Sequence, residues 1–255
     1  MDLPTQLLTS LQAQDLPLPS PTWLASLIAA RNPPPPLASL VATARARLLA
    51  SDLTTPGLLD ASYATSHSLP PAATAAAVAV VLPRAVVVQV LDLEDVSRSR
   101  WEQVEELEAI ERGEGTRGRR VVRLPVGGDG EGEQGEGEEG NDRQGQGRGP
   151  GSGPVAAEPG AGGARNATHK LVLQDARGQK VFALELKRVG RIGVGTTNIG
   201  EKILLKRGAT LARGVVMLEP STCTVLGGKV DAWQKPWLEG RLARLREAAL
   251  ANGPE

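Results

Sequence analysis

The sequence contains very few of the residues on which most catalytic and metal sites depend. It has one cysteine and two histidines in 255 residues, and neither His67 nor His169 lies in a cluster with metal-ligand spacing. The single cysteine excludes an intramolecular disulfide, and because Cys223 lies in an apolar run we expect it to be a small buried side chain. We therefore predict a protein that is not an enzyme and that holds no cofactor and no metal.

Net charge and aromatic residues are also scarce. Lysine plus arginine equals aspartate plus glutamate at 29 each, so no global field attracts nucleic acid. Aromatic residues make up 2% of the chain, and the core must therefore be built from Val, Leu, Ile and Ala. The N-terminus lacks a basic segment followed by an apolar one, so we expect no secretory signal.

Two stretches resemble familiar motifs but fail on their details. Leu69–Leu91 is long enough for a membrane span, yet Arg84 lies near its middle and prolines interrupt it. We interpret Pro71–Leu82 as a packed connector and Ala85–Leu93 as a buried strand. The glycine-rich Gly195–Lys202 is not a phosphate loop, because Glu201 stands where that motif needs lysine and a strand-like run follows.

The region from Lys170 to Val230 has the pattern of a small β-barrel or sandwich. Two apolar runs flank a turn at Asp175–Gly178, which predicts a hairpin. Glycines and a proline separate three further short runs, namely Ile203–Leu205, Val215–Leu218 and Thr224–Leu226.

Helical patterns lie on either side of this region. Three apolar stripes at helical spacing occupy the first sixty or so residues, and Ser20-Pro21 is typical of a helix start. We expect this bundle to pack on itself or on the barrel, with docking of a partner helix as the alternative. Pro236–Leu250 predicts one more helix.

Between the buried strand and the hairpin lies an insertion, 97–168. Ser97–Arg112 predicts a helix, since Ser99 and Glu102 form a capping box. Its apolar residues recur at every third position and are expected to share one broad face, which packs either on the barrel or on another protein: Trp101, Val104, Leu107 and Ile110. Residues 127–163 hold half of the chain's 30 glycines and are predicted to be disordered.

Single-strand nucleic-acid binding by a five-stranded barrel of the OB type normally requires aromatic side chains in a basic groove. Phe182 is the one aromatic residue in the barrel region. Basic residues there are available for weak contact with phosphate: Lys187, Arg188, Arg191, Lys206 and Arg207.

Three motifs resemble the RecQ-mediated genome instability protein family, first subunit. They are Ile203-Leu-Leu-Lys-Arg-Gly208, Arg213-Gly-Val-Val-Met-Leu-Glu-Pro220 and Thr224-Val-Leu-Gly-Gly-Lys-Val230. The N-terminal helices, the Ser51-Asp-Leu53 turn and the Leu69-Pro70 entry are similar too, and the run from Asp95 to Glu105 resembles fungal members. The resemblance covers nearly the whole chain outside the glycine-rich stretch.

The resemblance implies an α+β fold, in which an N-terminal three-helix segment (1–68) packs on a five-stranded OB-fold barrel (69–235). The barrel carries the insertion 97–168 between its first two strands, ordered at 97–112 and 119–126, and a C-terminal helix (236–255) follows. It implies a non-catalytic nuclear subunit of a complex with topoisomerase III, a type IA topoisomerase, and a RecQ helicase. Such complexes dissolve double Holliday junctions, and the insertion would influence the topoisomerase gate.

From the stripe and the resemblance together we predict that Trp101, Val104, Leu107 and Ile110 anchor on the topoisomerase. The alternative function is a stand-alone OB-fold protein that binds single-stranded nucleic acid.

Overall fold

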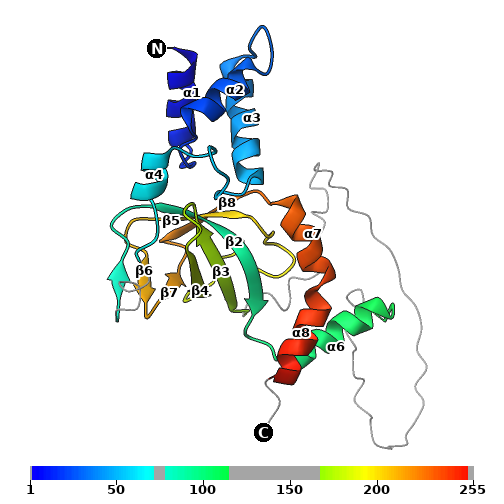
Figure 1. Cartoon of the computed structure of the whole chain (residues 1–255). Coiled ribbons are helices and arrows are strands. Elements are labelled where there is room, and N and C mark those ends of the chain that lie inside the picture. The colour runs from blue at the N-terminus through cyan, green and yellow to red at the C-terminus, as the bar shows by residue number, and fades with distance from the viewer. Residues whose placement is uncertain (1, 72–77, 115–166, 252–255) are drawn as a thin grey trace, which may run out of the picture.

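The computed structural model describes residues 2–71, 78–114 and 167–251, which form an α+β chain (Figure 1). One curled β-sheet stands at the centre. The N-terminal helices lie above it in this view, and the C-terminal helices run down its right side together with a helix from the insertion. Two apolar clusters hold the chain together, one inside the sheet and one among the N-terminal helices.

The sheet has the strand order β1-β6-β7-β4-β3-β2-β5-β8. All neighbouring strands are antiparallel except β4 and β7, which run parallel. The strands are β1 (Val80–Val81), β2 (Val86–Asp95), β3 (His169–Asp175), β4 (Lys180–Glu185), β5 (Lys202–Leu205), β6 (Thr210–Ala212), β7 (Val215–Leu218) and β8 (Cys223–Gly227).

Each apolar run that predicts a strand forms one, including the hairpin of β3 and β4. The described residues nevertheless form eight strands rather than the expected five. β1 and β6 are too short to leave a readable alternation, and they pair with each other. β7 pairs with β4 and β8 pairs with β5, although only residues 219–222 separate β7 from β8. β7 and β8 are far apart in the strand order, and this short link holds them close together. The sheet therefore curls on itself.

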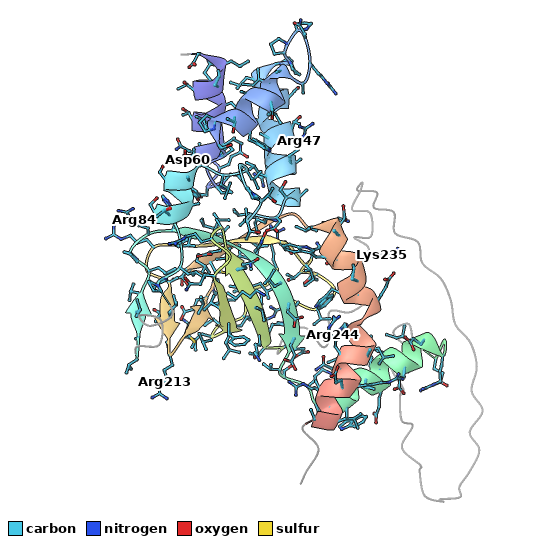
Figure 2. All side chains as sticks on the ribbon, in the orientation of Figure 1. Arg47, Asp60, Arg84, Arg213, Lys235 and Arg244 are labelled. Atoms are coloured by element: carbon cyan, nitrogen blue, oxygen red, sulfur yellow. The ribbon has the colours of Figure 1, made fainter. Side chains whose placement is uncertain are left out.

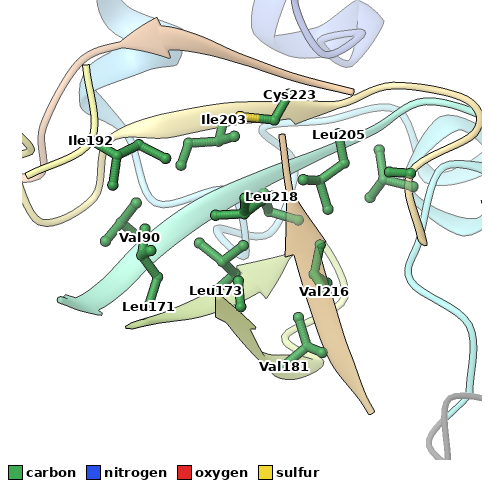
Figure 3. Packing of buried hydrophobic residues seen from close by; sticks show 14 of the residues in the cluster. Val90, Leu171, Leu173, Val181, Ile192, Ile203, Leu205, Val216, Leu218 and Cys223 are labelled. Carbon is green, nitrogen blue, oxygen red and sulfur yellow. The ribbon is translucent and has the colours of Figure 1, made fainter. Parts of the chain in front are cut away.

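Strand β2 is buried on both faces, which explains its nearly continuous apolar sequence. Val88 and Val90 point into the barrel core, where Figure 3 shows Val90 close to Leu171 and Leu173 from β3. Val87 points the other way and belongs to the cluster of the N-terminal helices. Strand β2 therefore contributes side chains to both apolar clusters.

The N-terminal segment contains the three predicted helices and a fourth that the sequence pattern does not show. The fourth is a short helix that begins after Asp60, whose carboxylate accepts hydrogen bonds from the backbone N–H groups of Ser62 and Tyr63, each at 3.0 Å. The four are α1 (Leu3–Gln12), α2 (Pro21–Ala29), α3 (Leu37–Ala50) and α4 (Ala61–Ser66).

A close backbone approach joins α3 to the barrel. Gly228 has a φ of +89°, and a Cβ placed on it would lie 2.3 Å from the carbonyl oxygen of Leu49. Beside it, the buried side chain of Gln89 accepts from the Leu53 N–H at 3.0 Å and donates to Asp52 Oδ1 at 2.7 Å. We call this contact, together with Lys202, the helix–barrel joint.

Lys202 pairs with Gln89 across β5 and β2 and is fully buried in the joint. Its Nζ donates to the Gly200 carbonyl at 2.6 Å. Burial lowers the pKa of Lys202 to about 8, and the negative charge of Asp52 opposes that change only in part.

The C-terminal region differs from the single predicted helix at Pro236–Leu250. It forms α7 (Asp231–Glu239) and α8 (Arg241–Ala251), so the first helix begins five residues earlier and Gly240 separates the two. Pro236 lies inside α7 and removes one helical hydrogen bond. Contacts of Trp237 with the barrel core, and its 2.7 Å indole hydrogen bond to Asp92, offset that loss.

No helix in the described ranges combines the length and apolar character that crossing a bilayer requires. Most of the connector predicted at 71–82 lies in or beside the undescribed residues 72–77, and its end forms β1. The predictions for 119–126 and 127–163 also fall outside the described residues.

Candidate functional site

Helix α6 (Arg100–Glu111) is an insertion between two paired strands. It follows β2 and precedes β3, and Asp95 of β2 pairs with His169 of β3. The predicted capping box is confirmed: the Ser99 hydroxyl accepts from the Glu102 N–H at 3.2 Å, and the Glu102 carboxylate accepts from the Ser99 N–H at 2.9 Å. The cap fixes where the helix starts relative to the strand.

The first turn of α6 is tied to the end of β2. The buried amide of Gln103 donates to the carbonyls of Asp95 and Arg98 at 3.0 and 3.3 Å. The Arg100 guanidinium donates to Glu94 at 2.8 Å. These contacts leave α6 projecting from the barrel with a defined direction.

Helix α8 lies against α6 and supports it (Figure 1). The apolar part of this contact is small, since Val104 on α6 and Ala249 on α8 are the fully buried apolar residues of the two helices. Arg246 adds two hydrogen bonds to Glu108, at 2.7 and 3.0 Å, on the exposed side.

The structure divides the predicted apolar stripe. Val104 is 2% exposed and faces the chain itself, and Leu107 is half-buried. Trp101 and Ile110 remain exposed, at 50% and 57%. A helix turns by about 100° per residue, so steps of three residues shift each side chain by about 60° around the axis.

The expectation that the four residues share one face is therefore wrong. Trp101 and Ile110 are nine residues apart and lie on roughly opposite sides of α6, with Val104 between them. The sequence left two alternatives, packing on the chain's own barrel and docking on another protein. In the structure Val104 is buried within the chain, and Trp101 and Ile110 are exposed. Contact with a partner remains a prediction, and in the free chain Trp101 and Ile110 are the exposed members.

A groove of about 600 Å³ opens beside α6. Leu107 and Ile110 of α6, the 193–196 loop of the barrel and Arg241 of α8 line it. Arg98 also lines the groove, and its guanidinium pairs with Glu106 at 2.6 Å. The groove is thus lined by both the insertion helix and the barrel.

Two of the lining residues, His169 and Arg188, belong to a buried polar cluster around Glu185. His169 Nδ1 lies 2.6 Å from Glu185 Oε2, and Arg188 donates to Glu185 Oε1 at 2.8 Å. Burial disfavours the charged Glu185 carboxylate, but hydrogen bonds from His169, the Val189 N–H and Arg188 outweigh it, so the pKa of Glu185 is lowered. The cluster fixes the start of the loop at 188–200.

Two family models match this chain. The model described as "RMI1, N-terminal OB-fold domain" matches residues 60–241, and "RMI1, N-terminal helical domain" matches residues 11–56. The chain belongs to the RMI1 family. Among curated proteins it is similar to "RecQ-mediated genome instability protein 1" of Schizosaccharomyces pombe, with 38% identity over 73 residues. That match covers 29% of this chain and 30% of the relative, so less than a third of the relative's length is compared.

The basic residues predicted for weak nucleic-acid contact are dispersed in this RMI1-family chain. Arg188 is half-buried in the cluster with Glu185, and Arg191 donates to the Val225 carbonyl at 3.2 Å. Lys187 is exposed and pairs with Glu219 at 3.1 Å. Lys206 and Arg207 lie in the turn after β5, where Lys206 is half-buried and Arg207 exposed. Structural contacts thus occupy three of the five side chains.

The cysteine and both histidines take part in structural contacts. No group of three or more His, Cys, Asp or Glu residues within the described ranges is arranged to hold a metal ion. Cys223 is buried in the barrel core as predicted, and burial raises the pKa of its thiol to about 11. His67 stacks on Tyr63 at the end of α4.

Sequence reasoning missed the pairing of His169 with Glu185. The signal that could have found it is the two-residue period of the hairpin. His169 shares the inward face with Leu171, and Glu185 shares it with Ala183. Because Lys170 pairs with Leu184, the same register brings His169 beside Glu185.

Proposed function

We propose that this chain is a non-catalytic subunit that acts with a RecQ helicase in genome maintenance in the nucleus. In this proposal it binds topoisomerase III and modulates the DNA gate of that enzyme during the dissolution of double Holliday junctions. Membership of the RMI1 family supports the genome-stability role, as does the name of the fission-yeast relative. The choice of topoisomerase III rests on the resemblance of the motifs.

The observation that carries the proposal is the exposure of Trp101 and Ile110 on a helix that α8 and the end of β2 hold in place. A large aromatic side chain that is half exposed on a fixed helix is typical of an interface anchor. Burying the exposed half of a tryptophan, roughly 100 Å², supplies about 2–3 kcal/mol at 25 cal/mol per Å². Because α6 is already ordered in the free chain, binding loses less conformational entropy.

Contact alone does not alter a gate. A bound subunit shifts the open and closed populations only by the difference in its affinity for the two states. We therefore expect α6 to contact parts of the topoisomerase that separate when the gate opens. In that case the chain would change the rate of strand passage without supplying a catalytic group.

The proposal is tested by measuring affinity for purified topoisomerase III with Trp101→Ala and Ile110→Ala. We expect each change to weaken binding about 10-fold or more, since about 1.4 kcal/mol corresponds to a factor of ten. Leu238→Ala is the matched control, because Leu238 is 53% exposed on α7 and lies outside the proposed contact.

Retained affinity in both α6 variants, with an unchanged thermal melt, would contradict a contact through α6. Loss of affinity in all three variants would show that binding does not depend on α6 in particular. A measurement of DNA relaxation by topoisomerase III, with and without the chain, then tests the gate: an identical rate at saturating chain contradicts modulation.

The alternative is a stand-alone binder of single-stranded nucleic acid. One exposed aromatic residue of the sheet, Phe182, favours it, but Lys170 already lies over that ring with its Nζ 4.8 Å from the centroid. A stacked base contributes about 1–3 kcal/mol, so a single aromatic ring that Lys170 partly covers supports only weak binding. Nanomolar, steeply salt-dependent binding of an oligonucleotide by the isolated chain would favour this alternative over the first.

A further inference from the structure

One face of the sheet is largely apolar, and no helix of the described ranges covers it. Strand pairing places Ala212, Val215, Phe182 and Val172 in one row across β6, β7, β4 and β3. The same pairing places Thr210, Met217, Leu184 and Lys170 in the next row. We call the apolar members of these rows, with Leu186, the open sheet face: Val172, Phe182, Leu184, Leu186, Ala212, Val215 and Met217.

The residues between these positions point into the barrel. Val181 and Ala183 on β4 and Val216 and Leu218 on β7 belong to the barrel core, whereas no member of the open sheet face belongs to either apolar cluster of the described chain. Phe182 is 51% exposed and Leu186 is 60% exposed, and the other five members are half-buried. In Figure 1 the described helices lie above the barrel and along its right side, and none lies beside β6 and β7.

Such a face requires explanation, since a solvated sheet face normally alternates polar residues with the buried ones. Contiguous exposed apolar residues on a folded chain mark a site of interaction. None of these residues lies on α6, so the topoisomerase contact proposed above does not use them.

Strand pairing places two carboxylates, Asp92 and Glu94, on the β2 side of the open sheet face, where Trp237 and Arg100 bind them. The remaining charges at its rim are basic. Lys170, Lys180 and Arg213 are placed around it, and within the described ranges none of the three forms an ion pair with a carboxylate. Figure 2 shows Arg213 at the turn between β6 and β7, pointing away from the sheet. Lys187, a fourth basic residue near this face, does form an ion pair, with Glu219 at 3.1 Å. Charge complementarity therefore favours an acidic partner.

The size and chemistry of the face favour a single helix from another protein. Four strands about 4.8 Å apart span about 14 Å, which accommodates one helix of about 10 Å diameter but not a typical domain interface. The face is mainly aliphatic, and the ring of Phe182 is already covered on one side by Lys170. Stacked bases need aromatic rings, so nucleic acid fits less well.

We propose that the open sheet face binds an amphipathic acidic helix of a partner protein. The apolar side of that helix would cover Phe182, Leu184 and Met217, and its flanking carboxylates would pair with Lys170, Lys180 and Arg213. This assigns the chain a second protein contact in addition to α6.

The test uses the full chain, isotopically labelled, and two synthetic helical peptides that carry the same leucine stripe. One peptide has glutamate on its polar face and the other has lysine. We expect the acidic peptide to bind at least 10-fold more tightly and to shift backbone amide resonances of β4 and β7. Phe182→Ser should weaken the acidic peptide 10-fold or more, and Lys170→Glu/Lys180→Glu should remove the preference for the acidic peptide.

Leu238→Ser is the matched control, since Leu238 on α7 has a similar exposure of 53%, and we expect unchanged peptide affinity. If Phe182→Ser does not fold, Phe182→Leu combined with Leu186→Ser replaces it. Equal binding of both peptides, or shifts confined to other strands, contradicts the proposal. Tighter binding of a thymidine oligonucleotide at the same residues would assign the face to nucleic acid, and dimerisation abolished by Phe182→Ser would assign it to a second copy.

Discussion

The barrel makes contact with helices on two sides, and the two contacts differ in kind. On the side of α1–α4, a continuous apolar cluster includes Val87 and Leu204 from the sheet, and Gly228 lets the backbone of α3 approach closely. On the side of α6 and α8, the fully buried residues are few, and ion pairs such as Arg246 with Glu108 connect the two helices at the exposed surface.

The difference separates a permanent joint from an adjustable one. Buried apolar area and satisfied buried hydrogen bonds are not weakened by charge screening, whereas exposed ion pairs contribute little and are screened by salt. We expect the helix–barrel joint to unfold with the barrel as one unit. The α6–α8 pair should open locally at a lower cost, as segments with few buried apolar contacts do.

The largest effect is expected at the joint. Gly228→Ala places a methyl group 2.3 Å from the Leu49 carbonyl oxygen at a φ of +89°, and we expect it to destabilise the chain by about 3–4 kcal/mol. Gly227→Ala is the matched control, since its φ is +96° but no atom lies within 4 Å of the added carbon. That change should cost only about 1–2 kcal/mol of backbone strain. Urea denaturation measures both, and equal losses would show that close packing at Gly228 is unimportant.

Lys202→Met tests the buried charge in the same joint. The folded-state pKa of Lys202 is about 8, below its ordinary 10.5, so the unfolded chain binds more protons between these values and stability from this group rises with pH across that window. Below pH 8 the full cost of the buried charge is present. We expect the methionine variant to be more stable at pH 7 by on the order of 2 kcal/mol, with most of this advantage gone by pH 10. Parallel stability curves from pH 7 to 10 would contradict a buried titrating lysine.

The same chemical change on either side of the barrel sharpens the comparison. Ser20 caps α2, and its hydroxyl also donates to the Gly57 carbonyl, whereas Ser99 caps α6. Each serine-to-alanine change costs about 1 kcal/mol of helix stability. Ser20→Ala should lower the denaturation midpoint of the whole chain. Ser99→Ala should instead speed hydrogen exchange in α6 alone, and a whole-chain shift of equal size would contradict local opening.

The smallest effect is expected for the exposed pair of Glu108 and Arg246. A double-mutant cycle with alanine at both positions should give a coupling energy of about 0.2–1 kcal/mol that falls as salt is raised. Thermal melts at low and high salt measure it. A coupling that does not change with salt would place the pair among the permanent contacts.

Much of the fold follows from local pattern. The capping box at Ser99, the cap at Ser20 and the two-residue alternation of β3 each specify their element without help from distant residues. The missed pieces depend on tertiary contact. β1 and β6 are too short to be recognised without each other, and α7 includes Pro236 because Trp233 and Trp237 pack on the barrel core.

The site was less accessible to sequence reasoning. Spacing identified the apolar residues of α6, but it could not show that Val104 is buried whereas Trp101 remains exposed. The open sheet face could not be predicted from the sequence for a related reason. Val215 and Phe182 are distant in the chain and become neighbours only through the parallel pairing of β7 with β4.

The pairing of Asp95 with His169, continued by the hydrogen bond from the Val96 N–H to the Thr168 carbonyl at 2.9 Å, has a consequence for how such chains can diverge. It closes the strand pair at the point where the insertion leaves and returns. Each doubling of the closed segment then costs only about 0.6 kcal/mol of loop entropy. The barrel therefore tolerates large changes in the length of the insertion, and the partner contact proposed for α6 can vary among relatives without redesign of the scaffold.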